Sequence, residues 1–363
     1  MDIHSPLLPH TTSITYLSEG GANIVYRLAT SDADSSPVSD NSDNHGFGPE
    51  TPPPTELELW QVEALEAESE ARLLEGKLLR LRKQLGTATT IIAAQRDYEQ
   101  LIVPLFSNGD LVEQTTVKVP DYRLNELDRQ LRSMELNGTR SMKRRNVYLS
   151  REGVGTLVTD MSPRPDLDLM LLEIKPKWLT QSPSAPKGAR RCRTCALRAM
   201  KRRNSDTKTP KQGHFCPLDL VSKDRNIVAE ALYRLYNETH NSTKPVPRSD
   251  PTLNRVIDFV ATCPILKRLR ELQIALDPNG VLNGNIHDSQ LLTAMTLRDC
   301  TWFLRIPKAV DGELKARLGD LDQKSPKKVE YWRSIEQQLI DEGWYLCGEK
   351  QPFSDPIICA LQR

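Results

Sequence analysis

The sequence predicts an α+β protein with a β-rich N-terminal lobe and a larger, mixed C-terminal lobe. Residues 13–29 contain two β-prone runs around Gly20-Gly21, the pattern of a strand, a tight turn and a second strand. Hydrophobic periodicity further along the chain indicates helices at 223–240, 251–275 and 326–342, with a short strand pair around 294–306. No internal repeat is present, so the elements are expected to build two distinct lobes.

We assign residues 1–162 to the N-terminal lobe and residues 163–363 to the C-terminal lobe. The boundary follows a strand-like run at 154–161, after which the segment SPRPDLD is expected to form a hinge. A strong apolar run at 167–179 then begins the C-terminal lobe.

The N-terminal lobe contains an insertion. Residues 30–55 are rich in Ser, Asp and Pro and almost free of apolar side chains, so they are expected to be a disordered loop. The acidic segment 56–75 is helix-forming, and KLLRLRK after Gly76 is a candidate strand. Residues 98–107 are expected to form a buried strand that a proline ends, and residues 122–142 a polar helix.

The charges of the chain are segregated. Its 49 Lys and Arg against 48 Asp and Glu leave a net charge of +1, and its apolar share is 38%. Residues 31–75 nevertheless carry twelve acidic residues and one Arg, whereas residues 187–211 carry ten Lys and Arg and one Asp. The cationic segment suits a polyanionic ligand, and the low apolar share is consistent with the polar insertion.

Several protein classes are disfavoured. No apolar run reaches the roughly 18 residues of a membrane helix, and the N-terminus lacks the pattern of a secretory signal. Seven scattered Cys residues do not form a disulfide framework, so the nucleus or cytoplasm is the expected location. We expect neither a membrane nor a nucleic-acid partner, and we expect a monomer.

Two motifs favour phosphate binding. The glycine turn in EGGANIVYRL, residues 19–28, can bring backbone N–H groups close to phosphates, although an ordinary hairpin looks the same. In EIKPK, residues 173–177, a strand would place Lys175 and Lys177 on one face with Glu173, which suits anion stabilisation or an exposed strand edge.

The basic segment RRCRTCALRAMKRRN, residues 190–204, has several interpretations. It suits polyphosphate, nucleic acid or a nuclear import factor, but no aromatic residues are interleaved for base stacking. Cys192-x-x-Cys195 suggests zinc, with His214 and Cys216 as a candidate second pair. A CxxC motif without a clean second half is a weak signal, so zinc is the disfavoured interpretation.

Acidic residues and a helix start complete the candidate chemistry. Asp299 lies between two apolar, strand-like pieces, where an aspartate is a metal ligand, a base in phosphoryl transfer or an ordinary turn residue. Ser325 is a good N-cap with a proline after it, yet Lys327 and Lys328 occupy the first helical turn, where cations are unfavourable unless an anion binds there. Asp320 and Asp322 lie just upstream, close enough in sequence to hold a Mg²⁺ beside that anion. One face of this helix carries Val329, Trp332, Ile335 or Glu336, and Leu339, and Gly343 can end it.

Taken together, the motifs resemble the inositol-pentakisphosphate 2-kinase family, in a fungal-type version. The motifs that carry the resemblance occur in family order and are EGGANIVYRL (19–28), GKLLRLRK (76–83), EIKPK (173–177), RCRTC (191–195), FCPLDLVS (215–222), RDCTWFL (298–304) and DLDQKSPKK (320–328). The resemblance implies a two-lobed inositol polyphosphate kinase fold, distantly similar to protein kinases. It also implies transfer of the ATP γ-phosphate to the 2-hydroxyl of inositol pentakisphosphate, which gives inositol hexakisphosphate.

The resemblance also implies site residues. The implied ligands of ATP are Gly20, Gly21, Ala22, Asn23, Val25, Arg80, Asp160 and Met161. The implied catalytic pair is Lys175 and Asp299, with Asp320 and Asp299 as Mg²⁺ ligands. The implied inositide ligands are Arg145, with Arg144 as its alternative, Lys177, Lys201, Lys324, Lys328 and Trp332, with Tyr331 as its alternative.

The chain departs from the family pattern in one motif. Where the family usually reads DLDLKP, this chain has Gln323 and Ser325, with the proline one place later. The aromatic ligand is therefore open between Tyr331 and Trp332, and Arg255 is a candidate for a central-lobe contact. The alternatives are a kinase of other regiochemistry, an inert protein that binds inositol phosphates, and a zinc or nucleic-acid protein that acts through 187–211.

Overall fold

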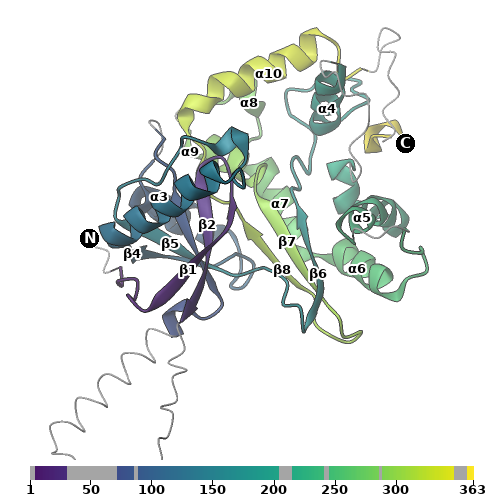
Figure 1. Ribbon diagram of the computed structural model, residues 1–363. Helices are drawn as coiled ribbons and strands as arrows, with labels where there is room; N and C mark the ends of the chain where they lie inside the picture. Colours follow the sequence, from purple (N-terminus) through teal and green to yellow (C-terminus); the bar gives the residue numbers. More distant parts are fainter. Residues whose placement is uncertain are drawn as a thin grey trace, which may run out of the picture. The chain divides into compact units, whose positions relative to one another are not determined.

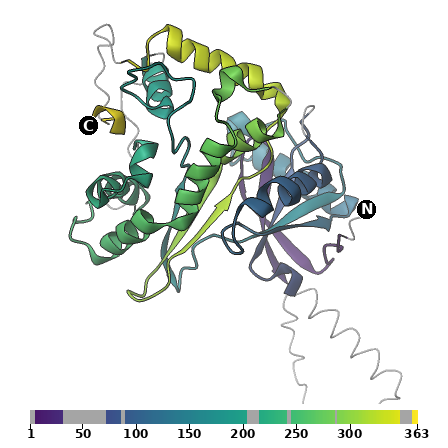
Figure 2. The ribbon, with the colours of Figure 1, turned by 180° about the vertical axis from the view of Figure 1, so that it is seen from behind.

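The computed structural model describes residues 5–30, 72–85, 89–203, 215–240, 245–285, 288–346 and 358–363. The chain forms two compact units (Figures 1 and 2). Unit 1 comprises residues 1–93 and 113–160, and unit 2 comprises residues 94–112 and 161–363. The predicted insertion at 30–55, and most of the acidic helix predicted at 56–75, lie outside the described residues.

Unit 1 is built on a five-stranded antiparallel sheet in the order β1-β2-β3-β5-β4 (Figure 1). Its strands are β1 (Thr12–Glu19), β2 (Asn23–Thr30), β3 (Lys77–Arg82), β4 (Gln114–Lys118) and β5 (Val154–Thr159). The predicted hairpin at the double glycine is confirmed, because β1 pairs with β2 and the turn falls at residues 20–22. The predicted strands after Gly76 and at 154–161 are also present.

One helix supplies the main helical part of the unit 1 core. Helix α3 (Asp121–Leu136) confirms the helix predicted at 122–142. Its Leu124, Leu127 and Leu131 are buried in one cluster with strand residues such as Ile24 and Leu79. The spacing of three and four residues places these leucines on one face, which packs against the sheet.

Unit 2 contains a three-stranded antiparallel sheet in the order β6-β7-β8. Its strands are β6 (Asp168–Ile174), β7 (Thr301–Pro307) and β8 (Lys315–Gly319). Ile174 pairs with Trp302 and Thr301 pairs with Gly319, so the end of β6, the start of β7 and the end of β8 lie at one edge. This edge positions the charged residues described below.

Unit 2 also contains most of the described helices (Figure 2). They are α2 (Ile91–Asp97, which begins in unit 1), α4 (Arg193–Arg203), α5 (Arg225–His240), α6 (Pro251–Thr262), α7 (Pro264–Ala275), α8 (Gly280–Asn283), α9 (Ser289–Leu297) and α10 (Val329–Asp341). The helices predicted at 223–240, 251–275 and 326–342 are confirmed, although Pro264 divides the second into α6 and α7. One large core joins Trp302 and Ile306 of the sheet to leucines of α5, α6 and α7.

The strand predicted at 98–107 is wrong. The chain there continues from α2 into a short π-helix, η1 (Tyr98–Ile102), and a 3₁₀ turn, η2 (Val103–Leu105). Tyr98 and Ile102 are four residues apart and both are buried, which is a helical spacing. A short apolar run is compatible with either a buried strand or a buried helical segment. This run continues the helical conformation of α2, which precedes it.

The strand pair predicted around 294–306 is half right. Its second half is β7, but its first half is helix α9, whose last seven residues are all buried. A helix that is apolar all round has no amphipathic stripe, and it therefore resembles a buried strand in sequence.

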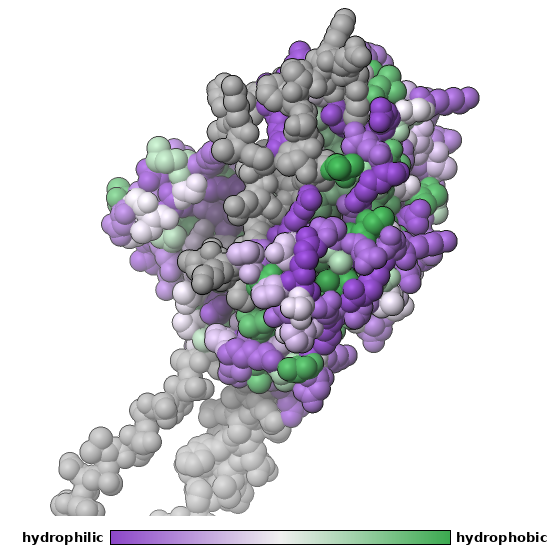
Figure 3. Space-filling view, turned by 90° about the vertical axis from the view of Figure 1, so that its right-hand side faces the viewer, coloured by the Kyte–Doolittle hydropathy of each residue, from purple (hydrophilic) through white to green (hydrophobic). Residues whose placement is uncertain are grey.

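The described part of the face shown in Figure 3 is mainly polar. No helix among the described residues is both long enough and apolar enough to cross a bilayer. Hydrophilic side chains dominate the face in Figure 3, and apolar ones are scattered among them.

Candidate functional site

Three charged residues lie at the common edge of the β6-β7-β8 sheet. Lys175 directly follows β6, Asp299 lies two residues before β7, and Asp320 directly follows β8. Since the register brings these strand ends together, residues that are 145 positions apart in the chain come into contact. Asp299 therefore lies between a helix and a strand, not between two strands as the sequence suggested.

The three residues form a connected set of ion pairs with two more lysines. The Lys177 Nζ lies 2.7 Å from one carboxylate oxygen of Asp299, and the Lys324 Nζ lies 2.6 Å from the other. The Lys175 Nζ donates to the backbone carbonyl of Asp299 and to the Asp320 carboxylate, at 3.2 Å in each case. The structure thus brings together five sequence-predicted site residues in one charge cluster.

The lysines determine the ionisation of Asp299. Its partial burial alone would raise the pKa of the carboxyl group, but hydrogen bonds from Lys177 and Lys324 outweigh burial and hold the pKa well below its usual range. Asp299 is therefore a carboxylate at neutral pH and accepts hydrogen bonds only. Nearby Glu173 has its pKa raised, first by burial and then by the charge of Asp320.

The backbone around the charge cluster is unusual at two positions. Lys177 and Asp320 both adopt a left-handed conformation, with φ of 57° in each. The strand assumed for EIKPK ends at Ile174, so Lys175 and Lys177 do not share a strand face. The chain instead turns after β6, and both ammonium groups still reach Asp299. The two left-handed residues are among the charged groups of the cluster, as expected where function determines local conformation.

A buried arginine anchors the segment that carries Asp299. The guanidinium of Arg298 lies 2.5 Å from Asp277 and 3.6 Å above the Trp178 ring, and its exposure is 2%. It also donates to the Gln273 carbonyl. Because these three contacts fix the Arg298 side chain, the backbone of the neighbouring Asp299 is also held in place. Arg298 was not singled out from the sequence, where a surface arginine looks the same.

The segment 320–328, which departs from the family pattern, is held in place by hydrogen bonds to α9. The Gln323 amide bonds to the hydroxyls of Thr293 and Thr296 on α9, and the Lys324 backbone N–H donates to Thr296 Oγ1. These contacts direct Lys324 to Asp299. The Ser325 hydroxyl accepts from the Lys327 N–H, which confirms the predicted N-cap.

The face of α10 agrees with its predicted pattern. Val329, Trp332, Glu336 and Leu339 are buried, and a glycine with positive φ follows the helix at residue 343. Trp332 is only 8% exposed, within an apolar cluster that includes Trp178, whereas Tyr331 is 59% exposed. The structure therefore favours Tyr331 over Trp332 as an aromatic ligand.

The remaining inositide candidates lie on helical segments. Lys328 is exposed in the 3₁₀ turn η5 (Pro326–Lys328) that precedes α10, and Lys201 is exposed near the end of α4. In unit 1, Arg145 donates to the Arg140 carbonyl, whereas the Arg144 guanidinium lies beside the glycine turn. The roles of these four residues stay predictions.

A buried ion-pair network supports the glycine turn of unit 1. Glu19, at the end of β1, accepts hydrogen bonds from Nε and Nη2 of Arg140 at 2.9 Å each and pairs with Lys83 at 2.5 Å. The Lys83 ammonium also donates to the Gly20 carbonyl. Burial by itself would raise the pKa of Glu19, yet its hydrogen bonds with Arg140 and Lys83 lower it. Burial also lowers the pKa of Lys83 despite its partner.

The glycines of this turn leave open space above it. Neither Gly20 nor Gly21 has positive φ, and a Cβ at either position would meet nothing closer than 3.9 Å. The fold therefore does not require glycine here, whereas close approach of a ligand to the backbone would. Val25 pairs directly with Arg80 across β2 and β3, so two further nucleotide candidates are neighbours.

The other nucleotide candidates are Ala22, Asn23, Asp160 and Met161. Ala22 lies in the turn and Asn23 begins β2. The Asp160 N–H donates to the Gly76 carbonyl at the end of unit 1, and Met161, which begins unit 2, is buried. Their contact with adenine stays a prediction.

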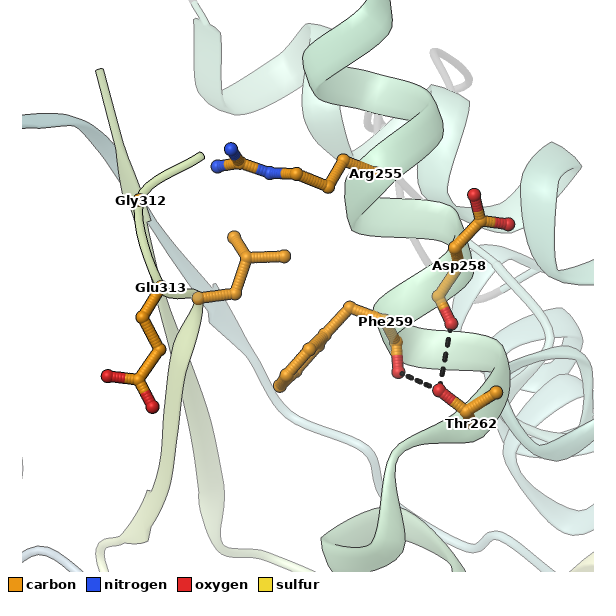
Figure 4. Close-up of a pocket in the computed structure, with 7 residues that line it drawn as sticks. Arg255, Asp258, Phe259, Thr262, Gly312 and Glu313 are labelled. Atoms are coloured by element: carbon orange, nitrogen blue, oxygen red, sulfur yellow. Dashed lines mark hydrogen bonds between the residues drawn. The ribbon is translucent and has the colours of Figure 1, made fainter. Parts of the chain in front are cut away.

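Unit 2 contains an open pocket of about 560 Å³ (Figure 4). Its lining includes Arg255 and Phe259 of α6 and the turn between β7 and β8, at the end of the hairpin opposite to Asp299 and Asp320. Arg255 donates to the carbonyls of Ala309 and Val310. Arg255 thus supports a loop far along the hairpin from the cluster, which argues against its use as an inositide contact.

Most of the basic segment 190–204 forms a helix, and its two cysteines lie close to two further cysteines of the chain. Residues 193–203 form α4, and Arg193, Arg198 and Arg203 contact Glu336, the Phe215 carbonyl and Trp344 respectively. Cys192, Cys195 and Cys216 come together with Cys359, which the sequence did not suggest. His214, the other proposed partner, lies outside the described residues.

The charge cluster offers donors that suit Mg²⁺. The carboxylate oxygens of Asp299 and Asp320 are hard ligands. The Lys175 ammonium contacts the Asp320 carboxylate and the backbone carbonyl of Asp299, so both residues lie beside it. Both side chains are about half exposed, which leaves room for the water and phosphate ligands that Mg²⁺ keeps. The two residues therefore fit the predicted metal.

Comparison with known proteins identifies a consistent set of relatives. A family model described as inositol-pentakisphosphate 2-kinase matches residues 16–338. The chain is 29% identical over 215 residues to an inositol-pentakisphosphate 2-kinase of Yarrowia lipolytica, covering 53% of this chain and 66% of the relative. It is 25% identical over 211 residues to that of Debaryomyces hansenii, covering 48% and 50%, and 26% identical over 210 residues to that of Candida glabrata, covering 56% and 66%. The matches span between half and two thirds of the relatives' lengths.

Proposed function

The chain belongs to the inositol-pentakisphosphate 2-kinase family, and we propose that it transfers the γ-phosphoryl group of ATP to the 2-hydroxyl of inositol 1,3,4,5,6-pentakisphosphate. The product is inositol hexakisphosphate. The single observation that carries the proposal is the charge cluster in unit 2, where Asp299 is bound by Lys177 and Lys324 and lies beside Lys175 and Asp320. Three ammonium groups at one edge suit a substrate with five phosphates.

The chemistry of the charge cluster supports phosphoryl transfer. Such a reaction needs little covalent chemistry from the protein, because alignment of donor and acceptor and neutralisation of phosphate charge supply most of the rate. Lys175 would stabilise charge near the transferred group. When substrate binds, Lys177 and Lys324 would release Asp299 and bind substrate phosphates instead. Ammonium groups bind phosphate as point charges.

Asp299 and Asp320 would hold Mg²⁺, which supplies charge neutralisation on the phosphates when bound. The lowered pKa of Asp299 keeps it ionised, which favours a role in holding metal and orienting the hydroxyl over a role as a strong base. We place the exposed Lys201, Lys328 and Tyr331 among the inositide ligands. Trp332 would not contact the inositide and would instead stabilise the start of α10 by its packing.

ATP would use the glycine turn of unit 1. The open space above Gly20 and Gly21 and the pairing of Val25 with Arg80 support this assignment. A two-lobed kinase-like fold, a monomeric state and a location in the nucleus or cytoplasm complete the proposal. The α+β architecture of the two units is consistent with it.

An inert inositol-phosphate binder was the alternative suggested by the altered DLDQKSP motif. The contacts of Gln323 with α9 favour the enzyme, because they keep Lys324 on Asp299 in spite of the substitution. The test is a phosphoryl-transfer assay with the purified chain, Mg-ATP and inositol pentakisphosphate, with the product resolved by phosphate position. A binder without turnover would retain calorimetric binding of the inositide and release no ADP.

A further inference from the structure

The side-chain amide of Gln273, a fully buried residue of α7, bonds two backbone segments of the charge cluster at once. Its Nε2 donates to the Lys177 carbonyl at 2.9 Å and, at 3.4 Å, to the carbonyl of Leu297, the last residue of α9. Its Oε1 accepts from the Leu179 N–H at 2.9 Å. These partners fix the orientation of the amide, because only its NH₂ group can donate to the two carbonyls. The amide therefore joins the turn that carries Lys177 to the segment that leads to Asp299.

The backbone of Gln273 makes a further contact on the Asp299 side. Its carbonyl lies at the C-terminal end of α7, where backbone carbonyls lack partners within the helix, and it accepts from Nη2 of Arg298 at 3.1 Å. A cation is favourable at this end of a helix, and Arg298 also pairs with the buried Asp277 at 2.5 Å. Since Arg298 directly precedes Asp299, Gln273 holds the Asp299 segment by both its backbone and its side chain.

A buried stacked pair links the same two segments again. Trp178 directly follows Lys177, and Arg298 directly precedes Asp299. The Arg298 guanidinium lies 3.6 Å from the centroid of the Trp178 ring, and both side chains are buried. The neighbours of the Lys177–Asp299 ion pair are thus themselves in contact. Neither segment can shift against the other without loss of buried contacts.

We propose that Gln273 is a positioning residue for phosphoryl transfer, an inference that rests on the function proposed above. The left-handed conformation of Lys177 is unfavourable and persists only where its surroundings determine it. Gln273 provides such surroundings, because it bonds the carbonyl of Lys177 and the N–H two residues later. It therefore determines where the Lys177 ammonium lies relative to the Asp299 carboxylate. A displacement of about 1 Å can lower a rate about a hundredfold, so an amide that touches no substrate would still control the chemical step.

Gln273→Met tests the proposal, because it keeps the length of the side chain and removes its hydrogen bonds. We expect kcat of the full chain to fall about tenfold to a hundredfold. The KM for ATP should be unchanged, since ATP is assigned to the glycine turn of unit 1. Gln95→Met is the matched control: it changes another buried glutamine, whose amide donates to Glu99 one helical turn later, and it should leave kcat unchanged. An equal fall of kcat in both variants would overturn the proposal.

A double-mutant cycle separates positioning from a general loss of stability. If Gln273 acts by placing the Lys177 ammonium, its change should have no further effect once that ammonium is removed. The double variant Gln273→Met with Lys177→Met should therefore turn over at the rate of Lys177→Met alone. Circular dichroism at the assay temperature shows whether each variant is folded. A loss in the double variant equal to the product of the two single losses would refute positioning through Lys177.

Two measurements give a result even if the unmutated chain transfers no phosphate, an outcome that would refute the proposed function. The same cycle is measured by calorimetry with inositol pentakisphosphate, and we expect the losses of affinity to be non-additive in the same way. Hydrogen–deuterium exchange should be faster in Gln273→Met in both residues 175–181 and residues 296–301, and unchanged there in Gln95→Met. Unchanged exchange in either segment of Gln273→Met would contradict a clamp between them.

A second variant keeps the test valid if Gln273→Met does not fold. Gln273→Asn retains a donor and an acceptor, but its amide is one methylene shorter and cannot span both segments in the same geometry. It should show the same fall of kcat, the same unchanged KM for ATP and the same non-additivity with Lys177→Met. Turnover at the unmutated level in folded Gln273→Asn, with faster exchange in both segments, would show that the contacts of Gln273 are structural only.

Discussion

The Lys177 ammonium lies 2.7 Å from the Asp299 carboxylate, although 122 residues separate them in the chain. Lys177 is in a left-handed conformation. Asp299 directly follows Arg298, which forms a buried ion pair with Asp277 after the end of α9. Both residues are thus held by their surroundings, and their side chains are still about two-fifths exposed. A paired but accessible aspartate and lysine are what a charged substrate requires.

Asp299→Asn should lower turnover by about a hundredfold to a thousandfold, because it removes a charge that orients the lysines and binds metal. The fold should be retained, since the side chain is partly exposed. Lys175→Ala should have a similar effect. Steady-state kinetics and circular dichroism check both variants. Glu313→Gln, in the pocket at the far end of the hairpin, is the control and should be close to unchanged. Activity near the unmutated level in both site variants would refute the assignment.

Gly21→Ala should raise the KM for ATP about tenfold, the equivalent of one lost hydrogen bond of about 1.4 kcal/mol. The midpoint of thermal unfolding should hardly change, because a Cβ at this position meets only the Arg144 guanidinium at 3.9 Å. An unchanged KM would show that the turn is an ordinary hairpin. Gly155→Ala serves as the contrasting variant: its Cβ would lie 2.8 Å from Leu79 and Leu81, so it should destabilise the fold.

Tyr331→Ala and Trp332→Ala should behave differently. Tyr331 is exposed, so its loss should weaken inositide binding and leave stability unchanged. Trp332 is buried beside Trp178, and its truncation should cost about 3–5 kcal/mol of unfolding free energy. Denaturant titration and calorimetric binding separate the two effects. Equal losses of stability in both variants would contradict the packing described.

Glu19→Gln should destabilise the protein by about 3–5 kcal/mol, because it removes the buried carboxylate that pairs with both Lys83 and Arg140. The pKa of Glu19 is lowered in the folded state, so the folded protein binds fewer protons than the unfolded chain in acid. Its contribution is therefore fully present above the ordinary Glu pKa of about 4.3 and is lost as the pH falls through the folded value.

Urea titrations across the acid range check this dependence. The unmutated protein should lose stability below about pH 4 more steeply than Glu19→Gln, since the variant has no proton to bind there. Parallel curves for the two proteins would show that Glu19 does not carry the effect.

Features that depend on local sequence were predictable. The double glycine between β-prone runs and the Ser325-Pro326 start of α10 both rest on backbone preferences of adjacent residues. The buried face of α10 followed from helical spacing, which left one position open between Ile335 and Glu336. The charged candidates Lys175, Asp299, Asp320 and Lys324 were also found, although their contact with one another depends on the register of β6, β7 and β8.

Features that depend on tertiary context were missed. The run at 98–107 became helical because it continues α2, and α9 resembled a strand because it is buried on all sides. The conformation of Lys177 is determined by its surroundings and has no sequence signal. Cys359, which lies close to Cys192, Cys195 and Cys216, is separated from them by most of the C-terminal half of the chain.

The most direct test of the proposed activity is the position of the transferred phosphate. The purified chain is incubated with Mg-ATP labelled in the γ-phosphate and with inositol 1,3,4,5,6-pentakisphosphate, and the product is resolved by chromatography and phosphorus NMR. The proposal predicts inositol hexakisphosphate labelled at position 2, formed about a hundredfold to a thousandfold more slowly by Asp299→Asn. No transfer by the folded, metal-loaded protein, or phosphate added at another site, would contradict it.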